Sequence, residues 1–214
     1  MTDPFTKAFY AGAISILVTH PLDTYKTRIQ TSIHSPFIPT CIRSLPSTLS
    51  TYPIFWGVFF ACKEASIPVI LCSSIASLVT NPLFVLKTRI QTGGIGTLSS
   101  LYRNGGLYAG YGATLLNSAK VGIQFPLYEY LKTILPTEAA AFTSKAVSTS
   151  ILYPLDLIRT LQRASTVNSS MIQVYKQIVF ERGYTGFYRG IVLYNIISSL
   201  RFSIMMSLIE TDRS

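Results

Sequence analysis

Long apolar stretches alternate with short polar ones along the chain, and the apolar stretches contain Ser, Thr, Gly and isolated basic residues. No run of purely apolar residues is long enough to identify a spanning segment by itself. Small polar residues within apolar helices are typical of a membrane bundle around a water-filled cavity. The pattern predicts six helices, at about 5–30, 47–64, 68–91, 110–133, 138–163 and 187–212, most of them long enough to span a bilayer when tilted.

A short motif occurs three times along the chain. The copies read PLDTYKTRIQ from Pro21, NPLFVLKTRIQ around Pro82 and YPLDLIRTLQR around Pro154. A basic residue stands five positions after each proline, and an apolar stretch rich in small residues precedes it. A recurring motif of this kind indicates an internal structural repeat. The basic residues are Lys26, Lys87 and Arg159.

A second, weaker motif falls between the copies of the first. It reads WGVFFACK ending at Lys63, IQFPLYEYLK ending at Lys132 and SIMMSLIETDR ending at Arg213. Each repeat therefore holds two helices. The predicted fold is an all-α membrane protein with six tilted transmembrane helices in three pseudo-symmetric two-helix repeats around a central cavity. It forms a single domain over residues 1–214, with repeats at approximately 1–66, 67–136 and 137–214.

Composition supports a membrane location, because 49% of the residues are hydrophobic and only 13% are charged. The net charge of +9 raises nucleic-acid binding as a possibility, but the basic residues are spread through the repeats rather than clustered. Helix ends and contact with anionic lipid explain such a distribution better. We therefore expect no nucleic-acid partner. The amino terminus has no basic, apolar or Arg-rich leader pattern, so any targeting signal is expected to be internal.

The residues of typical catalytic and metal sites are scarce. Cys41, Cys62 and Cys72 form no CxxC pair and are odd in number, which disfavours a disulfide or zinc framework. The only histidines are His20 and His34, and no nucleophile motif such as GxSxG occurs. We expect no catalytic residues, metal site or cofactor, and no enzymatic activity.

The repeated motifs resemble those of the mitochondrial carrier family, and the resemblance covers almost the whole chain. The family pattern on odd-numbered helices is proline, an acid, two spaced basic residues and glutamine. The first copy matches it completely with Pro21, Asp23, Lys26, Arg28 and Gln30.

The other two copies depart from the family pattern. The second keeps Lys87, Arg89 and Gln91 but has Phe84 where the acid belongs. The third keeps Pro154, Asp156 and Arg159, whereas Leu161 replaces the second basic residue and Arg163 stands at the glutamine position.

The resemblance implies a gate of ion pairs on the matrix side, in which acid and base come from different repeats. Carried over, it pairs Asp23 with Lys87 and Asp156 with Lys26. Arg159 then faces Phe84, and a guanidinium stacked on that ring is worth roughly 0.5–2 kcal/mol. Simple packing of Phe84 is the alternative.

A second gate on the cytoplasmic side follows from the motif of the even-numbered helices. It pairs Glu129 with Arg213 and Glu210 with Lys63, and it places Lys132 opposite Phe60, which occupies the position of an acid. Each gate thus has two ion pairs and one aromatic substitute. Solvated helix-end charges are the alternative for any single residue.

Family substrates bind midway between the gates. Lys120 and Arg201 stand nine residues before Glu129 and Glu210, and two cations at matched depth suggest an anionic ligand. Basic residues within membrane helices are costly unless they face water, a partner or a substrate. Pairing with carbonyls or lipid phosphate is the alternative. The expected substrate-binding residues are Thr48, Asn117, Lys120, Lys145, Ser198 and Arg201.

A finer resemblance concerns the substrate. The segment TNPLFVLKTRIQT at 80–92 is similar to carriers of pyrimidine nucleotides, folate, FAD and NAD, which typically have tryptophan where Phe84 stands. PLDTYKTR in the first repeat is similar to S-adenosylmethionine and iron carriers. The expected substrate is a small anion, a nucleotide or nucleotide-like cofactor, with S-adenosylmethionine or another metabolite as alternatives.

The family also implies the setting. We expect a functional monomer in the mitochondrial inner membrane or another organelle membrane, in contact with anionic phospholipid such as cardiolipin. The missing gate acids leave open a degenerate carrier that acts as a non-transporting membrane scaffold or interaction protein. Both gates retain their bases, however, which favours alternating-access transport.

Overall fold

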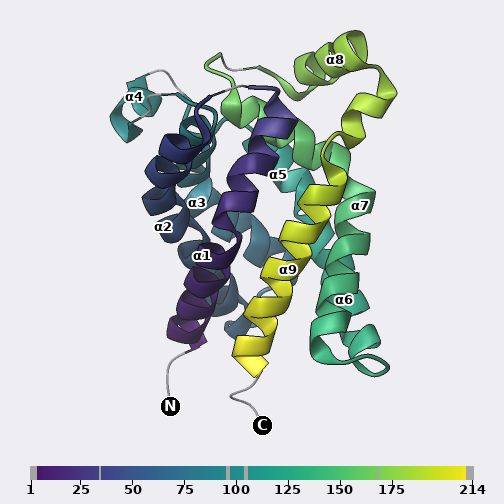
Figure 1. Cartoon of the computed structure of the whole chain (residues 1–214). Coiled ribbons are helices and arrows are strands. Elements are labelled where there is room, and N and C mark those ends of the chain that lie inside the picture. The colour runs from purple at the N-terminus through teal and green to yellow at the C-terminus, as the bar shows by residue number, and fades with distance from the viewer. Residues whose placement is uncertain (1–3, 34, 95–96, 104–105, 168, 211–214) are drawn as a thin grey trace.

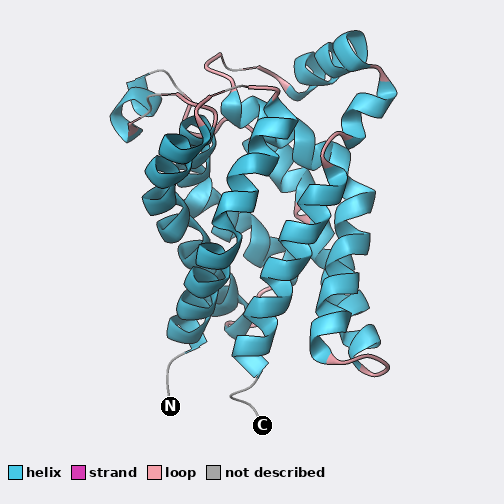
Figure 2. Cartoon of the chain, viewed as in Figure 1, coloured by secondary structure: helices cyan, strands magenta, loops and turns pink. Residues whose placement is uncertain are grey.

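The computed structural model describes residues 4–33, 35–94, 97–103, 106–167 and 169–210, with side chains from residue 13 to residue 204 of these ranges. All regular structure within them is helical (Figure 2). The long helices are α1 (Pro4–Thr31), α2 (Phe37–Glu64), α3 (Val69–Gln91), α6 (Ala119–Lys132), α7 (Thr137–Ala164) and α9 (Ile191–Glu210). Shorter elements are α4 (Leu98–Arg103), α5 (Tyr111–Asn117), α8 (Met171–Arg182) and the 3₁₀ helix η1 (Tyr184–Tyr188).

The long helices form a closed ring. Going round it, α1 packs on α2, α2 on α3, α3 on α5 and α6, these two on α7, α7 on α9, and α9 again on α1. The short helices α4 and α8 lie at one end of the bundle, opposite the end at which α1 begins (Figure 1). A ring of this kind has an interior to which every long helix contributes.

The second helix begins at Phe37, ten residues before the predicted start at 47. Pro46 and Pro53 lie inside it and do not end it. The hydroxyl groups of Ser47 and Thr48 donate hydrogen bonds to the carbonyl oxygen of Ser44 at 2.9 and 2.7 Å. Proline is tolerated inside membrane helices, so it is a weaker helix boundary here than in a soluble protein.

The helix predicted at 110–133 is divided into α5 and α6 at Ser118. The amide of Ser118 bonds to both Thr114 and Leu115 carbonyl oxygens, and its hydroxyl also donates to Thr114. The shared i−3 and i−4 bonds tighten this turn. The division lies between Asn117 and Lys120, two residues expected to bind substrate.

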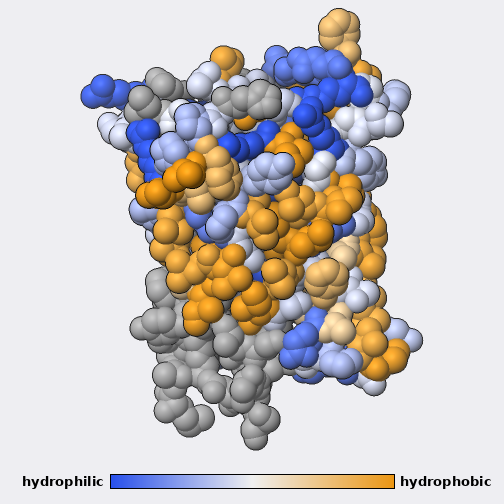
Figure 3. Space-filling model, viewed as in Figure 1, coloured by the Kyte–Doolittle hydropathy of each residue, from blue (hydrophilic) through white to orange (hydrophobic). Residues whose placement is uncertain are grey.

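Within the described helices, α3 is the one that is long and apolar enough to cross a membrane by length and composition, with a mean hydropathy of 2.0. On the face shown in Figure 3, apolar side chains gather across the middle of the bundle and hydrophilic ones gather at the end that carries α8. Many large apolar side chains on the outside of the ring are exposed, including Leu17, Val18, Leu71, Val79 and Ile151.

Candidate functional site

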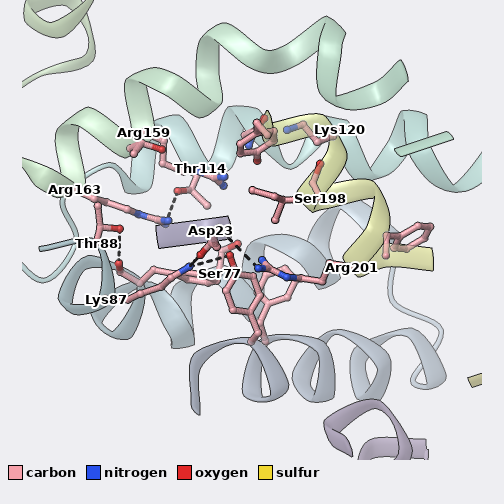
Figure 4. Close-up of a pocket in the computed structure, with 18 of the residues that line it drawn as sticks. Asp23, Ser77, Lys87, Thr88, Thr114, Lys120, Arg159, Arg163, Ser198 and Arg201 are labelled. Atoms are coloured by element: carbon pink, nitrogen blue, oxygen red, sulfur yellow. Dashed lines mark hydrogen bonds and ion pairs between the residues drawn. The ribbon is translucent and has the colours of Figure 1, made fainter. Parts of the chain in front are cut away.

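A cavity lies inside the ring and is lined by side chains from α1, α2, α3, α5, α6, α7 and α9 (Figure 4). Its described lining is strongly basic. The described lining has seven basic side chains and one carboxylate, that of Asp23. A second carboxylate, that of Asp156, is bonded to two of the seven basic side chains. Seven formal positive charges against two negative ones leave five in excess. The basic residues are Lys26, Lys87, Lys120, Lys145, Arg159, Arg163 and Arg201.

Asp23 is the centre of one ion-pair cluster and is fully buried. Its carboxylate accepts hydrogen bonds from Lys87 Nζ at 2.5 Å and from Lys26 Nζ at 2.9 Å, and Arg201 Nη2 lies 3.8 Å away. Gln91 Nε2 lies at 3.4 Å and braces the same oxygen as Lys87. The pair Asp23–Lys87 implied by the family resemblance is therefore present, and it joins α1 to α3.

Asp156 is the centre of the second cluster and is also fully buried. Asn117 Nδ2 donates to it at 2.6 Å, Arg159 Nη2 donates at 2.6 Å, and Lys120 Nζ forms an ion pair with its other oxygen. Three donors from α5, α6 and α7 thus use both carboxylate oxygens.

The expected pair between Lys26 and Asp156 is wrong for this structure. Lys26 instead bonds to Asp23, three residues earlier on the same helix face, and lies 4.6 Å from the ring centre of Tyr194. Lys120 and Arg159 take the place of Lys26 at Asp156. Lys26 thus pairs within its own helix, while Asp156 pairs with Arg159 of its own helix and with Lys120 of α6.

The expected stacking of Arg159 on Phe84 is also wrong. Arg159 pairs with Asp156, and the guanidinium over Phe84 belongs to Arg163, 4.9 Å from the ring centre. Arg163 Nη2 also donates to Asn81 Oδ1 at 2.7 Å and to Thr114 Oγ1 at 3.1 Å. The sequence showed a base at the glutamine position of the third repeat, but this signal alone did not indicate its role.

Five of the six expected substrate-binding residues line the cavity. Thr48 does not belong to the described lining, because it is fully buried in α2 and donates to its own helix. The five that line it are Asn117, Lys120, Lys145, Ser198 and Arg201.

Arg201 and Lys145 differ in how their charges are held. Arg201 Nε donates to Thr19 Oγ1 at 3.0 Å, and the guanidinium lies 4.4 Å from the ring centre of Tyr52, besides its contact with Asp23. Lys145 Nζ donates to Gln124 Oε1 at 2.8 Å. Among the described residues, no carboxylate lies within ion-pair distance of Lys145.

Aromatic rings from three helices pack together toward the end of the bundle away from Asp23 and Asp156, and Phe202 among them lines the cavity. Phe59 of α2 stacks on Phe125 of α6 with centroids 5.7 Å apart, and Phe125 meets Phe202 of α9 edge to face at 6.1 Å. Phe60 packs on Phe59 at 5.4 Å, and Lys63 Nζ lies 4.9 Å from the ring centre of Phe125.

The remaining cytoplasmic-gate residues lie near the surface or outside the described part. Glu129 and Lys132 are exposed, and Lys132 lies over the ring of Tyr128 on its own helix at 5.8 Å. The side chains of Glu210 and Arg213 lie outside the described residues. The pairs expected for Glu210 and Arg213, which are Glu129 with Arg213 and Glu210 with Lys63, stay predictions.

Comparison with known proteins agrees with this architecture. A family model described as mitochondrial carrier protein matches residues 69–139 and 137–213. Mitochondrial substrate carrier family protein W of Dictyostelium discoideum is 28% identical over 84% of this chain and 76% of its own length. The mitochondrial FAD carrier protein of Saccharomyces cerevisiae is 26% identical over 85% of this chain and 86% of its own length. The chloroplastic nicotinamide adenine dinucleotide transporter 1 of Arabidopsis thaliana is 26% identical over 84% and 81%.

These relatives are carriers in organelle membranes, and members of the family are transporters rather than enzymes. Because the matched segments cover more than half of the chain, the protein belongs to the mitochondrial carrier family and is a metabolite transporter of an organelle membrane.

Proposed function

We propose that this carrier transports a nucleotide or nucleotide-like anion by alternating access, through six tilted spans in three two-helix repeats of approximately 1–66, 67–136 and 137–214. The observation that carries the proposal is the excess of five positive charges in the cavity lining. Cations inside a membrane protein are costly unless a partner neutralises them. An anionic substrate supplies the missing negative charge.

Aromatic side chains support a substrate with a planar ring system. Tyr52, Phe55, Trp56, Phe84 and Tyr194 line the same cavity as the basic residues. Nucleobases stack on such rings, and each stacked base is worth about 1–3 kcal/mol in nucleic-acid complexes. A cavity that combines cations with aromatic rings suits a ligand that has phosphate groups at one end and a base at the other.

The charge also separates this substrate class from S-adenosylmethionine. A probable S-adenosylmethionine carrier 2 of Arabidopsis thaliana is 27% identical over 84% of this chain, so the resemblance alone does not decide. S-adenosylmethionine has a sulfonium and an ammonium group against one carboxylate, and it therefore adds positive charge to a basic cavity. NAD and FAD, the cargoes named for two other relatives, have phosphate anions.

The two gates set the mode of transport in this proposal. Swinging a two-state equilibrium from 1:99 to 99:1 requires about 5.5 kcal/mol of differential binding. Gates with Phe84 and Phe60 at acid positions lower that requirement. We therefore expect measurable net uptake in addition to exchange, in a functional monomer of the mitochondrial inner membrane that contacts anionic lipid such as cardiolipin.

Uptake into liposomes tests the proposal. The purified protein is reconstituted, and uptake of labelled AMP, ADP, NAD and S-adenosylmethionine is compared. Lys120→Gln and Arg201→Gln are expected to lower nucleotide uptake by about tenfold or more, because each removes a cation from the cavity. Lys176→Gln is the matched control, since Lys176 is exposed on α8 outside the cavity.

The outcomes separate the candidate functions. Nucleotide uptake that both cavity variants reduce and the control retains supports the proposal. Uptake of S-adenosylmethionine alone contradicts the anionic substrate. No uptake of any compound, with no thermal stabilisation of the detergent-solubilised protein by any of them, favours the non-transporting scaffold.

A further inference from the structure

Arg163 lies in the same cavity lining as the cations of the two ion-pair clusters but has no carboxylate partner among the described residues. We propose that Arg163 binds a phosphate group of the substrate, and that it gives the cavity its preference for nucleoside diphosphates over monophosphates. The proposal rests on the proposed function and adds a residue that the family resemblance does not place in the substrate site.

The direct contacts that Arg163 makes with described residues are neutral, although the side chain is buried. It is 6% exposed, and its contacts are the amide oxygen of Asn81, the hydroxyl of Thr114 and the ring of Phe84. Nη2 makes both hydrogen bonds, while the buried Nε has no partner. A buried guanidinium without a counter-ion and with an unused donor is the arrangement that a bound oxyanion completes.

The neighbouring cations already have carboxylate partners. Lys26, Lys87 and Arg201 surround Asp23, whereas Lys120 and Arg159 bond to Asp156. An anion that binds these five competes with a carboxylate already in place. Arg163 offers its charge without that competition.

Position and chemistry both favour phosphate. The planar guanidinium donates parallel hydrogen bonds that match phosphate oxygens, which lysine cannot do. Thr114 of α5 accepts a hydrogen bond from Arg163 at the cavity wall (Figure 4). Asn81 of α3 accepts another, so little side-chain freedom is lost on binding. Lys145 is the other lining cation with no carboxylate within ion-pair distance among the described residues. It lies eighteen residues earlier on α7, about 27 Å along the helix. One phosphate group cannot contact both, so they bind different parts of a ligand.

Affinities of adenosine, AMP and ADP for the detergent-solubilised protein test the proposal by calorimetry. Arg163→Gln removes the charge but keeps an amide that can donate to Asn81, and it restores the residue type found at this place in the first two repeats. The variant is expected to lose about 10- to 100-fold in ADP affinity, the range for charge-assisted hydrogen bonds, and to lose much less for AMP.

The matched control is Arg89→Gln. Arg89 is also buried at this end of the bundle, but it does not belong to the described lining of the cavity, and its Nε bonds to the backbone oxygen of Arg163 at 3.4 Å. ADP affinity is expected to stay within about twofold of the unchanged protein, since the cavity keeps its charge.

A second variant addresses the risk that Arg163→Gln fails to fold. Phe84→Asp keeps Arg163 and places a carboxylate beside it, where the aromatic ring now lies. Neutralising Arg163 in this way is expected to reduce the preference for ADP over AMP as strongly as removing its charge.

The outcomes distinguish this inference from the proposed function. Loss of the ADP preference in both cavity variants and its retention in Arg89→Gln support a phosphate site at Arg163. Unchanged ADP affinity in either Arg163→Gln or Phe84→Asp overturns the site while leaving a nucleotide carrier intact. If the unchanged protein binds none of the three compounds, the proposed function fails and the phosphate site fails with it.

Discussion

The two ends of the bundle are held together by different chemistry. At the ion-pair end, which comprises Asp23 and Asp156 with their basic partners, two fully buried carboxylates join α1, α3, α6, α7 and α9. At the aromatic end, which comprises Phe59, Phe125 and Phe202, stacked and edge-to-face rings join α2, α6 and α9. An arriving anion competes with the carboxylates for their cations, whereas it has no such competitor among the rings. The ligand is therefore expected to act on the ion-pair end first.

Asp23→Asn is expected to have the largest effect of single changes at either end. It leaves Lys26, Lys87 and Arg201 without their shared carboxylate, and breaking a buried ion pair from one side costs about 3–5 kcal/mol. Thermal unfolding in detergent measures the loss. Glu181→Gln on the exposed side of α8 is the control. Equal unfolding temperatures for the two variants would contradict a closing role of Asp23.

Phe125→Leu addresses the aromatic end. It keeps an apolar side chain but removes a ring that stacks on Phe59 and meets Phe202, at an expected cost of about 2 kcal/mol. Added ADP is expected to raise the unfolding temperature of this variant by the same amount as that of the unchanged protein, because the cation clusters keep their charges. Thermal unfolding with and without ADP makes the comparison. A shift by ADP that differs in size from that of the unchanged protein would show that the aromatic end also takes part in binding.

Phe84→Asp converts part of the ion-pair end to the family pattern by adding a third carboxylate. Arg163 lies 4.9 Å from the present ring, so the new acid has a partner at once. A gate strengthened by about 1.4 kcal/mol opens roughly tenfold more slowly. Exchange rates in liposomes measure this change, with Phe84→Leu as the control that removes the ring without adding charge. Equal exchange rates for Phe84→Asp and Phe84→Leu would mean that a carboxylate at this position does not strengthen the gate.

The sequence predicted the helices better than their contacts. Periodicity and the repeated proline motif located the long helices, because both depend on residues close in the chain. The predicted start of the second helix at 47 was wrong, because α2 begins at Phe37 and continues through Pro46. One continuous helix was predicted across Ser118, because the hydrogen bonds that tighten this turn depend on the folded backbone.

Of the two ion pairs expected on the matrix side, Asp23 with Lys87 is present in the structure and Asp156 with Lys26 is not. Asp23 meets Lys87 across two helices, as the family pattern implies. Lys26 and Arg159 instead bond to acids three residues earlier on their own helices, a choice that depends on side-chain distances that no alignment of motifs contains. The partners of Arg163 come from α3 and α5, so its lack of a carboxylate partner among the described residues became visible only in the folded chain.

Tyr153→Phe is the finest test of the comparison, since it concerns a neutral contact at the ion-pair end. The hydroxyl of Tyr153 accepts a hydrogen bond from Gln30 Nε2 at 3.0 Å and donates one to the backbone oxygen of Arg189 at 2.5 Å. It therefore joins α1 to α7, which the absent pair of Lys26 and Asp156 was expected to do.

Loss of this hydroxyl leaves a buried donor and a carbonyl oxygen without their partner, at a cost of about 1 kcal/mol. Tyr175→Phe on α8, where the ring is 43% exposed, controls for the change of residue type. A small loss of stability in Tyr153→Phe, with faster net uptake in liposomes, would indicate a light neutral link in place of an ion pair. A loss of stability as large as that of Asp23→Asn would mean that neutral hydrogen bonds, rather than buried charges, hold α1 against α7. The two ends of the bundle would then differ in the arrangement of their contacts more than in their charge.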